Sequence, residues 1–96
     1  MADSTDIIKV QSSKGFVYEV TIEHHPGIGL SMAYYKGATR IARREYSKLT
    51  PPIGDNDSDW ERYEESLAEW KSAAIADLTP ECKIHFDKRE GYNKRR

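Results

Sequence analysis

Cysteine and histidine are the side chains of this sequence best suited to binding zinc, and two of them are close together. Cys82 and His85 have the spacing C-x-x-H, and the adjacent His24 and His25 could complete a set of four ligands. Structural zinc sites usually use two close ligand pairs, and one thiolate with three imidazoles is an uncommon set. On a strand over residues 83–87, Cys82 and His85 would also point to opposite faces. We therefore expect no metal and no cofactor, with Cys82 acting as a small hydrophobe and the histidines exposed.

Three aspartates, Asp55, Asp57 and Asp59, occupy alternate positions, as at the start of a calcium-binding loop. Such a loop needs glycine at its sixth position and glutamate at its twelfth, which here are Trp60 and Ser66. The calcium motif therefore fails. The three carboxylates are better explained as an acidic entrance to a helix, where they interact with unpaired backbone N–H groups.

The sequence offers little support for nucleophilic catalysis. Serine, histidine and aspartate all occur, but no serine lies in a G-x-S-x-G turn between a strand and a helix. Residues 26–29, Pro-Gly-Ile-Gly, lead into a strand and lack the Lys and Ser/Thr of a phosphate-binding loop. We therefore predict that the protein is not an enzyme.

The charges of the chain are sorted into blocks behind a net charge of only -1. Counted along the sequence, residues 35–49 and residues 83–96 each carry a net charge of +4, whereas residues 50–82 carry -7. A surface divided in this way can steer a charged partner and fix its orientation.

The acidic block favours a protein partner. Its carboxylates lie on or near a predicted helix and are flanked by Trp60, Tyr63 and Trp70. Such a surface suits a basic groove on a larger protein or complex, where aromatic anchors give affinity and charge raises the association rate. A simpler explanation is that the aromatic residues form the core and the acids its solvated outer face. The predicted partner-binding residues are Asp57, Glu61, Glu64, Glu65 and Glu69.

The basic block supports an alternative, nucleic-acid binding by a hairpin over residues 34–48. Arginine and lysine bind phosphates, and tyrosine rings stack on bases. The acidic helix would repel a polyanion, and positive charge on an edge strand also serves to discourage aggregation. The residues of this alternative are Tyr35, Lys36, Arg40, Arg43, Arg44 and Lys48.

By elimination, we expect a small protein-interaction module that regulates or inhibits a larger protein or complex. A charge-rich chain of 96 residues without catalytic motifs would suit an accessory protein of a phage or mobile element, acting in the host cytoplasm. One cysteine, no basic and apolar leader, and no apolar run near about 20 residues predict a cytoplasmic protein that does not enter a membrane. A homodimer through an exposed edge strand stays open.

Alternating apolar and polar residues predict strands in the first half of the chain. The alternation is clearest around Ile8 and Val10, over 16–23, and again over 30–34. Segment 38–46 fits either a strand or a helix, and we favour the strand because Lys-Gly at 36–37 follows an alternating run.

One helix is predicted from Ser58, where Ser-Asp-Trp-Glu matches a capping box, to Pro80, which is expected to end it. Residues 83–87 alternate again and predict a short final strand. We therefore expect a single α+β domain over 1–96, an antiparallel meander of three to four strands with the helix packed on one face. Its N-terminus (1–5) is predicted to be flexible and its C-terminus (88–96) to be a basic tail. The stripe expected to face the sheet is Trp60, Tyr63, Leu67, Trp70 and Ala74.

Overall fold

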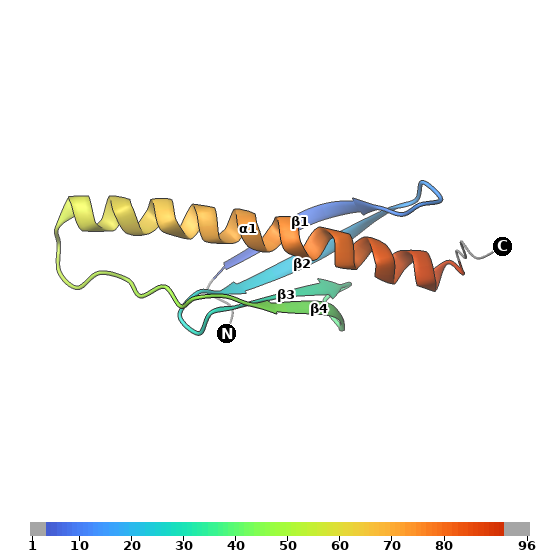
Figure 1. Ribbon diagram of the computed structural model, residues 1–96, viewed down its shortest axis with the longest axis horizontal. Helices are drawn as coiled ribbons and strands as arrows, with labels where there is room; N and C mark the ends of the chain where they lie inside the picture. Colours follow the sequence, from blue (N-terminus) through green and yellow to red (C-terminus); the bar gives the residue numbers. More distant parts are fainter. Residues whose placement is uncertain (1–3, 92–96) are drawn as a thin grey trace.

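The structure, a computed structural model, describes residues 4–91 and contains four strands and one helix in that range. The strands form a single antiparallel sheet in the order β1-β2-β3-β4, and α1 lies across one face of it (Figure 1). The predicted α+β class, an antiparallel meander with a helix on one face, is confirmed. The elements are β1 (Ser4–Gln11), β2 (Val17–His25), β3 (Leu30–Tyr35), β4 (Thr39–Glu45) and α1 (Asp57–Arg89).

Alternation along the strands separates a covered sheet face from an open one. Val20 and Ile22 of β2 are fully buried, whereas the residues between and beside them are more exposed. Val20 lies opposite Ile8 of β1, and Ile22 lies opposite Ala33 of β3, so inward residues of neighbouring strands form continuous rows. Phe16 continues the same alternation in sequence, but it precedes β2 and is 59% exposed. The core is therefore one layer between the sheet and α1.

Segment 38–46 contains a strand, β4, as favoured, and the strand has a bulge. Ala33 pairs with Ala42 and Tyr34 pairs with Arg40, which leaves Ile41 as an extra residue on β4. A bulge changes the direction of the side chains next to it. As a result, both Ile41 and Ala42 pack against the core, which strict alternation would not allow.

The buried residues of α1 recur at steps of four. Because each residue turns about 100° around the axis, a step of four drifts by about 40°. The buried row therefore winds gradually around the helix, which suits packing against a twisted sheet. The row consists of Trp70, Ala74, Leu78, Cys82 and Phe86.

Three predictions about the helix were wrong. Asn56 is the N-cap instead of Ser58, and its side-chain oxygen accepts from the N–H of Ser58 at 2.9 Å and of Asp59 at 3.4 Å. Pro80 lies inside α1 and does not end it, and residues 83–87 are helical, not a strand.

Packing on both sides of Pro80 explains why α1 continues through it. Proline removes one backbone hydrogen bond from a helix, but Leu78 before it and Cys82 after it are both fully buried against the sheet. In a strand, Ile84 and Phe86 would share one face. In α1, Phe86 is fully buried and Ile84 is 55% exposed.

The two predicted tails overlap with regular elements, because β1 begins at Ser4 and α1 continues to Arg89. Residues 1–3 and 92–96 of these two predicted segments lie outside the described part of the chain.

The helix is longer than the sheet face that it covers. Its first part extends beyond the sheet, at the left of Figure 1, and the linker of residues 46–56 runs back along it. In α1, no residue before Trp70 is buried. The molecule is accordingly elongated, with principal-axis extents of 58 × 21 × 19 Å. We call residues 57–69 the outer half of α1 and residues 70–89 its sheet-bound half.

Gly29→Ala is predicted to destabilise the fold. Gly29 has a φ of +73°, and an added Cβ would lie 2.3 Å from the backbone oxygen of Tyr46. Tyr46 is held in place because its N–H donates to the Gly29 carbonyl at 2.8 Å. We expect urea denaturation to show a loss of about 2–4 kcal/mol in the free energy of unfolding.

Gly27→Ala is the matched control, because no atom lies within 4 Å of a Cβ added at Gly27. Its effect should stay below about 1 kcal/mol. Equal losses in the two variants would contradict the close approach of Gly29 to the chain after β4.

Candidate functional site

The two halves of α1 use their carboxylates differently. All four carboxylates of residues 70–90 contact the sheet, its turns or the first residue of the linker. Asp77 accepts from the Tyr46 hydroxyl at 2.7 Å, and Glu81 pairs with Arg44 of β4 at 2.9 Å. Burial, and then the hydrogen bond to Asp77, raise the pKa of Tyr46 above its usual value, which keeps its hydroxyl protonated as the donor.

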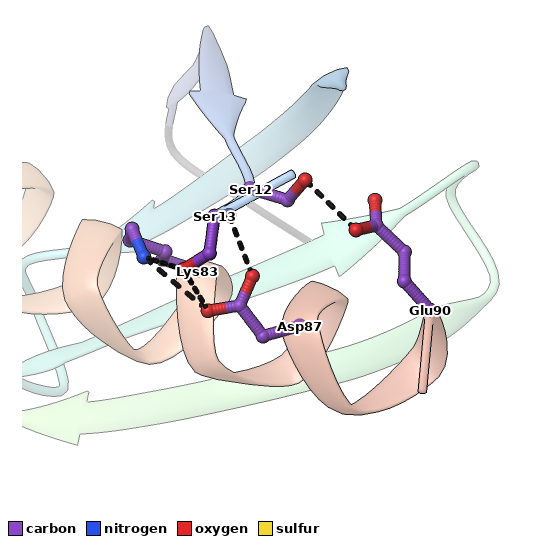
Figure 2. A network of polar contacts seen from close by, with 5 residues as sticks. All are labelled: Ser12, Ser13, Lys83, Asp87 and Glu90. Atoms are coloured by element: carbon purple, nitrogen blue, oxygen red, sulfur yellow. Dashed lines mark hydrogen bonds and ion pairs between the residues drawn. The ribbon is translucent and has the colours of Figure 1, made fainter. Parts of the chain in front are cut away.

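A polar network joins the end of the sheet-bound half to the β1–β2 turn (Figure 2). Asp87 accepts from the backbone N–H and from the hydroxyl of Ser13, each at 2.7 Å, and from the Lys83 ammonium at 3.2 Å. The hydrogen bond from the Ser13 backbone is the main cause that lowers the pKa of Asp87. Asp87 therefore remains charged in this contact and ties the turn to the helix.

Glu90, just after α1, extends the same network. It accepts from the Ser12 hydroxyl at 2.9 Å and from the hydroxyl of Tyr18 (Figure 2 shows the Ser12 contact). The hydrogen bond to Glu90 is the main cause that raises the pKa of Tyr18 to about 12. The Tyr18 ring stacks on Phe86 at a centroid distance of 4.0 Å, so polar and apolar contacts reinforce each other at this end.

The outer half shows the opposite behaviour. It carries six carboxylates and one cation, Arg62. Within residues 4–91, none of the six takes part in an ion pair. The five that the sequence singled out as partner-binding are all exposed: Asp57, Glu61, Glu64, Glu65 and Glu69.

Four of these carboxylates lie at steps of four and form one row, which we call the acidic ridge (Asp57, Glu61, Glu65 and Glu69). Residues four apart are neighbours on a helix, and each like-charged pair costs about 0.2–0.5 kcal/mol. The helix dipole stabilises negative charge only in the first turn, where Asp57 and Asp59 lie. The ridge is therefore locally unfavourable beyond that turn. Glu64 lies beside it, three residues from Glu61.

Two apolar side chains are exposed near the start of the outer half. Ile53 of the linker is 98% exposed and Trp60 is 38% exposed. The Trp60 indole N–H donates to the Gly54 carbonyl at 2.8 Å, and the ring meets Tyr63 edge-on at 5.9 Å. The expectation that Trp60 faces the sheet was wrong, because the sheet does not extend beneath the outer half (Figure 1).

The residues of the nucleic-acid alternative do not gather on one surface. Arg40 and Arg43 lie opposite Tyr34 and Met32 on the open sheet face. Arg43 pairs with Glu45 at 2.8 Å, whereas Arg44 points to the helix side, where Glu81 pairs with it.

The remaining members of that set are also dispersed. Tyr35 packs edge-on against Phe86 at 5.1 Å, between the sheet and α1. Lys36 lies in the β3–β4 turn, with its Nζ 5.4 Å from the centre of the Tyr35 ring. Lys48 lies in the linker at the other end of β4. The hairpin is present, but it does not present these side chains together.

The four residues of the zinc hypothesis are held apart. Cys82 is fully buried in the core, and burial raises the pKa of its thiol to about 11. His24 and His25 are consecutive on β2 and face opposite sides of the sheet. Cys82 and His85 lie one turn apart on α1, so the expectation of opposite strand faces was wrong. In the described part of the chain, no three His, Cys, Asp or Glu side chains are grouped to hold a metal ion.

Sequence reasoning missed a buried polar network around His24. The ring is fully buried, so the expectation of an exposed histidine was wrong. Its Nε2 donates to Asp6 at 2.9 Å and its Nδ1 accepts from the Ser31 hydroxyl at 2.9 Å. The side-chain types are those of a hydrolase triad, but Ser31 and His24 have no exposed surface, so no substrate reaches them. His24 is two residues from Ile22 on β2, so the two side chains lie on the same face of the sheet. This spacing is the signal that could have placed His24 in the core.

No helix between residues 4 and 91 has both the length and the apolar character that crossing a membrane requires. Comparisons of the chain with protein-family models, with curated proteins and with solved structures found no match.

His24 is predicted to make the protein less stable in mild acid. Burial lowers the pKa of His24 below its usual value of 6.5, and the contact with Asp6 opposes this only in part. Between the two pKa values the unfolded chain binds more protons than the folded one. The contribution of His24 is therefore complete above pH 6.5 and is lost as the pH falls below it.

Urea denaturation at about pH 8 and about pH 5.5 measures this loss. His24→Gln should be less stable than the wild type at the higher pH, because the buried contacts change, and should lose less stability on acidification. An equal loss in both proteins would show that His24 is not the group responsible.

Proposed function

We propose that the protein is a small, non-enzymatic interaction module that binds a basic surface of a larger protein or complex through the acidic ridge. The observation that carries this proposal is the contrast between the two halves of α1. The sheet-bound half places every carboxylate against the sheet, its turns or the start of the linker, whereas the ridge has no ion-pair partner among residues 4–91.

A cationic partner would relieve the repulsion within the ridge. Lysine or arginine side chains placed between successive carboxylates would convert unfavourable neighbours into favourable ones. Complementary charge also raises the association rate and fixes the orientation of the complex. The long row, which winds gradually around the helix, suits a groove lined with positive charge better than it suits a single basic residue.

Charge supplies rate and orientation, and the apolar residues next to the ridge supply affinity. Ile53 and Trp60 are exposed at the start of the outer half, and the indole hydrogen bond to Gly54 holds them close together. Desolvated aromatic and aliphatic anchors usually dominate the energy of an interface.

A regulator or inhibitor is the function that this surface supports best. A groove that normally holds nucleic acid is one basic surface of the required kind, and the module would compete for it. An accessory protein of a phage that blocks a host complex would act in this way. Nucleic-acid binding by the module itself has weaker support, because Arg43 and Arg44 are paired and point to different sheet faces.

Glu61→Lys is predicted to change stability and binding in opposite directions. It places a cation four residues from both Asp57 and Glu65, so the free energy of unfolding should rise by about 0.5–1 kcal/mol. Capture of the partner by the immobilised protein from a nuclease-treated cell lysate should fall at least about tenfold, because the ridge is interrupted.

Glu81→Lys is the matched control, since it reverses a carboxylate that contacts Arg44 in the sheet-bound half. It should lower stability and leave capture unchanged. Capture that is equal for the wild type and Glu61→Lys, or that yields only nucleic acid when nuclease is omitted, would refute the proposed function.

A further inference from the structure

A groove of about 500 Å³ lies between the outer half of α1, the linker and the adjacent end of the sheet. Its volume falls in the range of about 300–1,000 Å³ that is usual for small-molecule sites. No residue of the acidic ridge lines it, so it is separate from the proposed partner surface. Its described lining includes Ser4, Gly27, Leu49, Pro51, Leu67 and Lys71.

Hydrogen bonds from two tryptophans fix the linker above the helix. The indole of Trp70 donates to the Ser47 carbonyl at 2.9 Å, and that of Trp60 donates to the Gly54 carbonyl at 2.8 Å. Between these two points lie the prolines 51–52, whose rings fix φ. The linker wall is therefore preorganised, and a ligand would not need to order it.

One charged group of the groove lacks a partner among residues 4–91. The Ser4 hydroxyl oxygen is buried, so a ligand in the groove does not reach it. Lys71 is the one charged residue of the described lining, and it forms no ion pair. Asp6, two residues along the same face of β1, already accepts from His24. A free ammonium donates charge-assisted hydrogen bonds, and a carboxylate accepts them.

We propose that this groove binds a small organic acid with an apolar body. Its carboxylate accepts from Lys71, and its body packs between Leu49, Pro51 and Leu67. A cationic ligand would be repelled by Lys71, and a neutral apolar ligand would leave its ammonium without a counter-charge.

Phenylacetate and hexanoate, an aromatic and an aliphatic acid, are the probes, and their neutral primary amides are the comparisons. Each is titrated into the full chain and followed by amide chemical shifts. We expect at least one acid to bind with a dissociation constant below about 1 mM, and its amide to bind at least about tenfold more weakly. The shifted amides should belong to groove residues such as Gly27 and Leu67.

Lys71→Met keeps the apolar stem and removes the ammonium, so it should weaken acid binding about tenfold and leave amide binding unchanged. Lys9→Met, on the open sheet face, is the matched control and should bind like the wild type, as should Glu61→Lys. Equal affinity for acid and amide, wild-type acid binding by Lys71→Met, or no binding of either acid at about 10 mM would overturn the proposal.

Discussion

The buried row at steps of four along α1 is the contact on which the rest of the structure depends. The sheet has one open face, so its apolar face needs another element to cover it. Leu78, Cys82 and Phe86 provide that cover, packed on Val10, Val20 and Ile22. Because the row begins at Trp70, it also determines which part of the helix is bound to the sheet and which part extends beyond it.

The same boundary divides the chemistry of the helix. After Trp70, carboxylates accept from tyrosine, arginine and serine groups of the sheet, its turns and the start of the linker, as Asp77, Glu81 and Asp87 do. Before Trp70, carboxylates stand next to one another. Capping and the helix dipole explain the acids of the first turn, but Glu65 and Glu69 lie beyond their reach. Binding to a basic partner is the explanation that we propose for these residues.

The sequence predicted the sheet well and the end of the helix poorly, for physical reasons. Alternation on β2 and the hairpin signal after β3 are local properties of the sequence. The structure contains the strand and the hairpin that they predict. Pro80 is also a local signal, but burial of Leu78 and Cys82 on either side of it outweighs it. Residues 83–87 alternate like a strand, and only the row of buried residues shows that they continue a helix.

The candidate surfaces were only partly predictable. The positions of the charges along the sequence identified the carboxylates of the outer half. Their lack of ion pairs within residues 4–91, however, depends on where the sheet ends. The basic residues formed one block in sequence, and strand alternation with a bulge divides that block, so that Arg43 and Arg44 point to opposite faces.

Amide hydrogen exchange along α1 of the free protein tests the division of the helix most directly. Residues 74–86 should exchange only through global unfolding, at least about a hundredfold more slowly than residues 61–68, which open locally. Uniform protection along the whole helix would contradict the account, because it would show that the outer half is held as firmly as the half bound to the sheet.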